Sequence, residues 1–228
     1  MTPGPGRLTI GQVDMTHWPL YGLRLRTPRL ELRLPALEEL DALGQAAADG
    51  VHDPQAMPFH VPWTDLPPAE RARSVLQHHW QRLGSWTPGD WNLQLAVFLG
   101  GVVVGTQIVG AVDFAIKREI YTGSWLGQRY HGQGIGTEMR AAVLHLGFSG
   151  LNAESAVSGA HTSNAASCAV SRKLGYQPNG IFRTRVRDEL GYELRFVLDR
   201  ERWQQHSVTE VDIAGLRPCL PLFGLPGG

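Results

Sequence analysis

The feature that most constrains this chain is the segment HGQGIGT, which carries three glycines at alternate positions. It occupies residues 131–137, after the apolar run 120–126 and before the helix-forming run 137–148. Glycine permits positive φ angles and close approach of a ligand to the backbone. Free N–H groups at the start of a helix carry partial positive charge and bind phosphate groups. The pattern therefore favours a phosphate- or pyrophosphate-binding loop over an ordinary turn from strand to helix.

Two familiar nucleotide-binding motifs fit this loop less well. A Walker A loop needs a lysine after its last glycine, and Gly136 is followed by Thr137. A dinucleotide-binding fingerprint needs a third glycine where this chain has Thr137. It also needs an acidic residue after the following strand, whereas Glu154 stands at the start of that strand.

The balanced charge of the chain excludes several functions. Its 21 Lys and Arg residues match its 21 Asp and Glu residues, so there is no bulk attraction to nucleic acid or to an anionic membrane. No apolar run approaches the roughly 20 residues that span a bilayer. The N-terminal segment also lacks the apolar core of a secretory signal. We therefore expect a cytoplasmic protein with no nucleic-acid partner and no membrane partner.

The cysteines and histidines argue against a disulfide framework and against a metal site. Cys168 and Cys219 lie far apart and outside any C-x-x-C pair, which is typical of reduced thiols. The nine histidines are scattered, and the adjacent pair His78 and His79 would diverge around a helix. We expect no bound metal.

Hydrophobic periodicity predicts the element order β-α-α-β-β-β-α-β-α-β-β. The segments, in chain order, are 23–35, 36–48, 68–83, 93–99, 102–114, 120–126, 137–148, 153–160, 164–174, 181–187 and 192–198. A helix that joins two strands at the glycine loop implies one parallel crossover inside an otherwise antiparallel sheet. Pro and Gly residues near both ends predict a flexible tail over 1–16, one domain over 17–203 and a C-terminal extension over 204–228.

Several segments resemble one enzyme family. The acyl-CoA pyrophosphate loop of the GNAT N-acyltransferases reads Q/R-x-x-G-x-G/A, which here is His131-x-x-Gly134-x-Gly136. His131 departs from the usual Arg or Gln, but backbone N–H groups supply much of the grip in such loops. The stretch N-x-x-S-x-x-V-x-x-K-L-G-Y over 164–176 resembles a helix of the RimJ/RimL-like branch. The segments SWLGQRYHGQGIGTE and LRTPRLELRLP resemble two further parts of that branch, so the likeness covers residues 23–203.

The resemblance implies an α/β (α+β) fold with a mixed, mostly antiparallel central sheet and helices on both faces. It implies an enzyme that moves an acyl group from acyl-CoA to a primary amine by direct attack in a ternary complex. The amine would belong to a protein N-terminus, a lysine or a small molecule. Members often form homodimers, so a homodimer is expected. The alternative is a non-catalytic, regulatory acyl-CoA-binding module on the same fold.

The resemblance also implies which residues bind the donor. The strand before the loop would hold the pantetheine arm, the loop the pyrophosphate, and Arg172 or Lys173 the 3′-phosphate of CoA. The expected donor-binding residues are Trp125, Leu126, His131, Gly132, Gln133, Gly134, Ile135, Gly136, Thr137, Asn164 and Arg172.

Ser167 is the expected general acid. Its match in RimL-like enzymes is proposed to protonate the CoA thiolate, and it lies about one helical turn after Asn164. Asn164 would also cap that helix. The alternative role for Ser167 is a hydroxyl that bonds back to its own helix. A tyrosine acid found elsewhere in the superfamily is absent, because its position is Ser171.

The general base is open among five residues, which are Asp113, His161, Glu193, Asp188 and His60. A histidine has a pKa suited to neutral pH, whereas a carboxylate would need its pKa raised by burial. We rank Asp113 first, because it ends a strand that should neighbour the CoA cleft. The alternative for each residue is a place on the surface.

The acyl group is open between acetyl and succinyl. The segments DPQAMPFHVPWT and RPCLPLFG resemble parts of actinobacterial members that use succinyl-CoA. A buried succinyl carboxylate needs a cationic or hydrogen-bonding partner. Arg183, Arg185 and Arg187 share one face of a predicted strand, so one of them, or His60, could be that partner. The alternative is that this arginine face is solvated.

Overall fold

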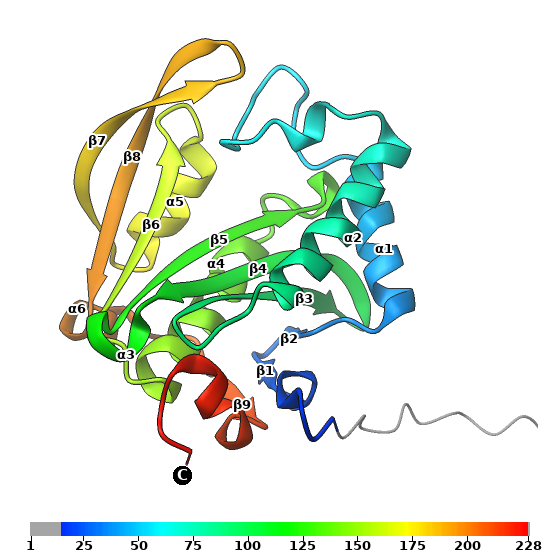
Figure 1. The fold of residues 1–228 in the computed structure, drawn as a ribbon. Coiled ribbons are helices and arrows are strands. Elements are labelled where there is room, and N and C mark those ends of the chain that lie inside the picture. Colours follow the sequence, from blue (N-terminus) through cyan, green and yellow to red (C-terminus); the bar gives the residue numbers. More distant parts are fainter. Residues whose placement is uncertain (1–14, 228) are drawn as a thin grey trace, which may run out of the picture.

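The computed structural model describes residues 15–227 and arranges them around one large sheet (Figure 1). In chain order, its strands and helices are β1 Arg24–Arg26, β2 Leu30–Arg33, α1 Leu37–Asp49, α2 Pro68–Gly84, β3 Asp90–Leu99, β4 Val102–Val112, α3 Phe114–Lys117, β5 Glu119–Leu126, α4 Ile135–His145, β6 Ser155–His161, α5 Ala165–Lys173, β7 Gln177–Val186, β8 Glu189–Asp199, α6 Arg200–His206 and β9 Asp212–Ala214. The nine strands lie in the order β7-β8-β6-β5-β4-β3-β2-β1-β9. None of the helices between residues 15 and 227 is long and apolar enough to cross a membrane.

Helices cover both faces of the sheet, as expected, because the side chains of β3 alternate between two cores. Leu93, Leu95 and Val97 face the larger core, which also contains apolar residues of α4 and α5. Ala96 and Phe98 face the smaller core, which contains residues of α1 and α2. This alternation is the period of two that a strand buried on both faces requires. The predicted fold class, a mixed and mostly antiparallel sheet between helices, is confirmed.

The predicted strand over 23–35 is instead a hairpin of β1 and β2, so this detail of the prediction is wrong. Pro28 has no N–H and fixes its own φ angle, which favours a turn there. The Thr27 N–H donates to the Leu30 carbonyl at 2.9 Å and closes that turn. The antiparallel meander of β3, β4 and β5 is confirmed.

The parallel crossover expected at the glycine loop joins β5 to β6 through α4. The two strands pair from Glu119 with Ser155 to Thr122 with Ser158, and the pairing ends there. β5 continues to Leu126 and β6 to His161. The remaining residues of these two strands therefore diverge, and an opening forms between them.

The C-terminal segment completes the sheet. β9 pairs with β1, and the side chains of Cys219 and Phe223 are fully buried. The Phe223 ring packs edge-on against that of Trp91, with 4.8 Å between ring centroids. Residues 204–227, expected as an extension of the domain, thus contribute to its core. Most of the tail expected over 1–16 lies outside the described residues.

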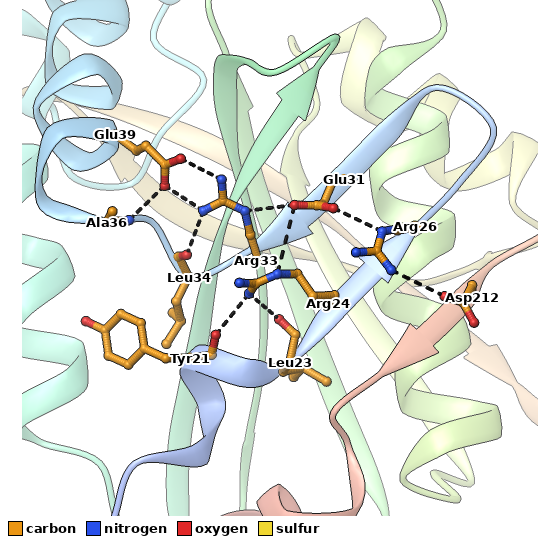
Figure 2. Close-up of polar contacts among 10 residues, drawn as sticks. All are labelled: Tyr21, Leu23, Arg24, Arg26, Glu31, Arg33, Leu34, Ala36, Glu39 and Asp212. Carbon is orange, nitrogen blue, oxygen red and sulfur yellow. Dashed lines mark hydrogen bonds and ion pairs between the residues drawn. The ribbon is translucent and has the colours of Figure 1, made fainter. Parts of the chain in front are cut away.

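A network of charges joins the β1–β2 hairpin to the start of α1 (Figure 2). The Arg33 guanidinium donates to both carboxylate oxygens of Glu39 at 2.5 Å, and to Glu31 at 2.8 Å. Glu39 also accepts the Ala36 N–H at 2.8 Å, so it caps the first turn of α1. Hydrogen bonds from Arg33, followed by the bond from Ala36, hold the pKa of Glu39 below its ordinary value.

We predict that Glu39→Gln lowers the free energy of unfolding by about 1 kcal/mol at neutral pH, because a charge-assisted bond becomes a neutral one. A carboxylate with a lowered folded-state pKa stabilises the protein above its unfolded-state pKa, and this contribution disappears as pH falls through the folded-state value. The gap between wild type and variant should therefore shrink below about pH 4.5. Denaturant unfolding at several pH values measures this gap. Glu38→Gln, an exposed neighbour in the same turn, is the control. A gap that stays constant with pH would contradict the assignment.

Candidate functional site

The glycine loop opens α4 with the backbone geometry that the sequence predicted. Gly132 and Gly134 have φ angles of 74° and 77°, a region that residues with a Cβ rarely adopt. Gly134 is the N-cap of α4, so the N–H groups of the first turn face outward from the helix start. A Cβ on Gly132 would meet open space. The loop therefore presents free backbone donors to an anionic ligand.

Residues of the β1–β2 turn hold this loop from outside. Arg29 Nε donates to Glu138 Oε2 at 2.6 Å, and Thr27 Oγ1 donates to Glu138 Oε1 at 2.6 Å. Arg29 Nη1 also donates to the carbonyl of Gln133 at 3.1 Å. Arg29 thus links two points of the loop and first turn to the sheet. Sequence reasoning did not single out Arg29, although it lies in the TPRL segment that carried the family resemblance.

A cleft of about 1830 Å³ runs from the glycine loop across the opening between β5 and β6. This exceeds the range of roughly 300–1,000 Å³ that is typical for small-molecule sites, so two substrates could share it. Of the donor-binding residues and the general acid predicted from the sequence, those that line the cleft are Trp125, Leu126, His131, Gly132, Gly134, Ile135, Gly136, Thr137, Asn164 and Ser167.

Two predicted donor-binding residues lie outside this cleft lining. The side chain of Gln133 turns back and donates to the carbonyl of Arg129 at 3.0 Å. Arg172 is exposed on α5, and so is Lys173. His131 replaces the Arg or Gln of the family motif, and it makes a local structural contact. Its Nε2 lies 3.1 Å from the Leu126 carbonyl and ties the loop to the end of β5.

The start of α5 presents Ser167 to the cleft. Asn164 Oδ1 accepts the Ser167 N–H at 3.1 Å, so Asn164 caps the helix as predicted. The hydroxyl that bonds back to the helix is that of Ser171, which donates to the Ser167 carbonyl at 3.2 Å. Within residues 15–227 the Ser167 hydroxyl itself makes no hydrogen bond to protein, so it remains available to a ligand.

Asp113 does not belong to the candidate site, and the geometric reason for ranking it first is wrong. It adopts a left-handed backbone with a φ of 54° and forms an ion pair with Lys117 at 3.2 Å. β4 runs antiparallel to β5, so the end of β4 lies beside the start of β5, away from the glycine loop. The sequence showed that Asp113 ends a strand, but not at which edge of the sheet that end lies.

The segment of residues 51–66, called the roof, lies near the tip of the β7–β8 hairpin (Figure 1). Residues 51–53 and 55–60 of the roof line the cleft. Arg187 donates to both oxygens of Asp65 at 2.9 Å and to the Pro54 carbonyl at 3.0 Å. Of the three arginines predicted on one strand face, only Arg187 lines the cleft, and it is already paired. Arg183 and Arg185 are exposed on the hairpin, which agrees with the solvated alternative for these two.

Two titratable side chains, His60 of the roof and Glu193 of β8, lie near His161 at the end of β6. Its imidazole is 2 % exposed, and the His60 ring lies 4.8 Å away, centroid to centroid. Glu193, its register partner on β8, has an oxygen 3.6 Å from His60 Nε2. Neither ring nitrogen of His161 makes a well-formed hydrogen bond within residues 15–227, although the Phe59 backbone is near enough to raise its pKa. Burial, then His60, outweighs this and lowers the pKa of His161.

These residues fit the acyl-CoA that the family resemblance implies. The glycine loop offers backbone donors for a pyrophosphate. β5 beyond Thr122 has no partner strand on its β6 side, so its backbone can accept an extended amide-containing arm. Ser167 and His161 lie along the same cleft.

We predict that Arg29→Ala weakens CoA binding about tenfold, a cost of about 1.4 kcal/mol, because the loop loses the donors that hold Gln133 and Glu138. Titration calorimetry with CoA measures this loss. Arg26→Ala is the matched control, since Arg26 lies on the same hairpin but pairs with Glu31 and Asp212. Equal CoA affinity in Arg29→Ala and wild type would contradict the positioning role.

Comparison with known proteins is consistent with this geometry. The family model for the acetyltransferase (GNAT) domain matches residues 29–177, more than half of the chain. Mycobacterium smegmatis RimJ, solved with CoA-disulfide, is 18% identical with a TM-score of 0.66, over 89% of this chain and 95% of that one. RimL, a ribosomal L7/L12 alpha-N-protein acetyltransferase solved with coenzyme A, is 19% identical with a TM-score of 0.62, over 77% and 97%. A GCN5-related N-acetyltransferase from Brucella melitensis is 21% identical with a TM-score of 0.64, over 81% of both chains.

The structural matches show a shared fold, and the residues that the family model matches include the glycine loop and the start of α5. The expectation drawn from the glycine loop and the Asn164 helix is thereby confirmed. This chain belongs to the GNAT acetyltransferase family of acyl-CoA-dependent N-acyltransferases.

Proposed function

We propose that this chain transfers an acyl group from acyl-CoA to the terminal amine of a protein or peptide, by direct attack in a ternary complex. One observation carries the proposal: a single cleft contains the glycine loop, the Ser167 hydroxyl and the buried imidazole of His161. The loop would bind the donor, Ser167 would donate a proton to the leaving thiolate, and His161 would accept a proton from the amine. The peptide acceptor is supported by similarity of fold to RimL, an alpha-N-protein acetyltransferase. A cytoplasmic homodimer is part of the same proposal.

Ser167 is the proposed acid for the leaving thiolate. Ser167 lines the cleft, its hydroxyl makes no hydrogen bond to protein in the described residues, and its N–H is held by Asn164. A group that donates a proton as negative charge develops on sulfur lowers the barrier more than it strengthens ground-state binding. Arg172, which is exposed on α5, is a proposed contact only for the 3′-phosphate of CoA.

His161 replaces Asp113 as the proposed base. It is buried in the cleft wall, whereas Asp113 lies outside it. Burial keeps the imidazole neutral at physiological pH, and a neutral imidazole can accept the proton that the amine loses. Glu193 and Asp188 also line the cleft, and Glu193 lies close enough to stabilise the imidazolium that forms.

The proposed function is tested by following CoA release with a thiol reagent. The acceptor panel contains peptides with a free N-terminus, N-terminally blocked peptides with one lysine, and small amines. Turnover with the first group only would support a terminal-amine acceptor. Binding of acyl-CoA without release over the whole panel would leave the chain as an acyl-CoA-binding module.

We predict that kcat/KM, expressed per neutral acceptor amine, stays high as the pH falls to and below 6.5, because the pKa of His161 is lower than its ordinary value of 6.5. The correction is needed because a peptide α-amino group itself titrates at about 7.7–8.0. Activity should then decline as the imidazole becomes protonated. His161→Asn should lose about 10²–10⁴-fold in kcat and lose this acidic limb. His78→Asn, on α2 outside the cleft lining, is the control. A His161→Asn variant with wild-type rate and pH profile would exclude His161 as the base.

The two candidate donors, acetyl-CoA and succinyl-CoA, differ in whether their acyl group would need a contact with His60. Its side chain lies on the roof of the cleft and is 55% exposed, whereas Arg187 is already paired with Asp65. A succinyl carboxylate would therefore depend on His60, and an acetyl group would not.

We predict that His60→Ala lowers kcat/KM for succinyl-CoA about tenfold and changes that for acetyl-CoA less than threefold, since an ionic hydrogen bond contributes about 1.5 kcal/mol. Steady-state kinetics with both donors measures this. His52→Ala, on the same roof and hydrogen-bonded to Thr64, is the control. A wild type that prefers acetyl-CoA, with equal losses for both donors in His60→Ala, would end the succinyl proposal.

A further inference from the structure

A buried arginine lies between the two helices that border the cleft, and neither the fold nor the proton transfers proposed above account for it. Arg140, on α4, is only 4% exposed and lines the cleft floor. Its Nη1 donates to the Ser171 hydroxyl of α5 at 2.9 Å. Its Nε is buried without a hydrogen-bond partner in the described residues.

This guanidinium has no counter-ion in the part of the chain that the structure describes. Each ion pair between residues 15 and 227 involves other arginines, lysines or histidines. The titratable groups that act on Arg140 are the Tyr176 hydroxyl and the Cys168 thiol, and no carboxylate is among them. Burial lowers the pKa of Arg140, but a guanidinium is not deprotonated at neutral pH.

A buried charge without a partner destabilises the folded protein. A buried, unpaired arginine therefore suggests a functional role. Other arginines of this chain are neutralised by a carboxylate: Arg33 pairs with Glu39, and Arg29 pairs with Glu138. Arg140 differs because it is buried deeper than either and lines the cleft. Its positive charge is therefore available to an anion that the protein does not itself supply.

The hydrogen bonds of Arg140 lead to the proposed acid. Ser171 accepts from Arg140 and donates to the Ser167 carbonyl, so one chain of contacts runs from the guanidinium to Ser167. Tyr176, which acts electrostatically on Arg140, has its hydroxyl 3.4 Å from Oγ1 of Thr122, the last residue of β5 that pairs with β6. The charge of Arg140 thus lines the cleft and is bonded to the helix that presents Ser167.

We propose that the uncompensated charge of Arg140 stabilises the CoA sulfur as it leaves, while Ser171 helps to hold the guanidinium in place. The inference rests on the proposed function. In the step it serves, the amine nitrogen bonds to the acyl carbon, the carbon–sulfur bond breaks, and its electron pair stays on sulfur. The amine proton goes to His161, while sulfur takes a proton from Ser167, and both side chains exchange with solvent afterwards. A fixed positive charge in a site shielded from water stabilises such developing charge.

The test is the acidity of the CoA thiol in its complex with the protein, read from NMR of the carbon next to sulfur as pH is varied. Wild type should bind CoA with a thiol that is at least about tenfold more acidic than free CoA. Arg140→Gln keeps a donor for Ser171 but removes the charge, so the thiol should return to the acidity of free CoA. Ser171→Ala keeps the charge and should retain most of the wild-type effect. In turnover, Arg140→Gln should lose about tenfold or more in kcat while CoA affinity below the thiol pKa is unchanged.

Three results would distinguish a failure of this inference from a failure of the proposed function. A bound thiol as weakly acidic as free CoA in the wild type would overturn the inference, and that measurement needs no variant. Equal thiol acidity in wild type and Arg140→Gln, with a lower melting temperature in the variant, would show that Arg140 only bridges α4 and α5. Absence of any CoA binding by the wild type would instead defeat the proposed function.

Discussion

The cleft exists because the parallel strands β5 and β6 stop pairing after Thr122 and Ser158. Parallel strands place their carboxyl ends at the same edge of a sheet, so the segments that follow them begin side by side. After β5 comes the glycine loop and the start of α4, and after β6 comes the start of α5. Two helix starts and an unpaired stretch of backbone therefore meet at one place. A ligand with an anionic group and an extended amide arm is the natural occupant of such a place.

Paired and unpaired charges have different roles in this fold. Opposite charges join separate elements, as Arg33 and Glu39 do at the start of α1. Arg187 and Asp65 do the same between roof and hairpin. Arg140 and His161 line the cleft and, in the described residues, have buried nitrogen atoms without hydrogen-bond partners. Buried titratable groups that lack partners are costly, and at a cleft they are candidates for a role in binding or reaction.

Elements with a strong period were predictable because burial imposes that period locally. The residues of α1 and α2, and the meander of β3, β4 and β5, repeat apolar side chains at 3.6 or 2 residues. The hairpin break at Pro28 and the strand β9 were not predicted. β9 has three residues, too few to show a period, and it is a strand only because β1 lies beside it.

The sequence alone determined the glycine loop, the cap at Asn164 and, through them, the family, because each depends on neighbours a few residues apart. Backbone freedom at Gly132 and Gly134, and a side-chain oxygen one turn from an N–H, are local properties. Only the tertiary structure decided which of the five candidate bases line the cleft: His60, His161, Asp188 and Glu193 do, and Asp113 does not. The physical reason is that burial and distance govern the charge state of a side chain. Both depend on which strand ends share an edge of the sheet, and strand pairing between distant segments determines that.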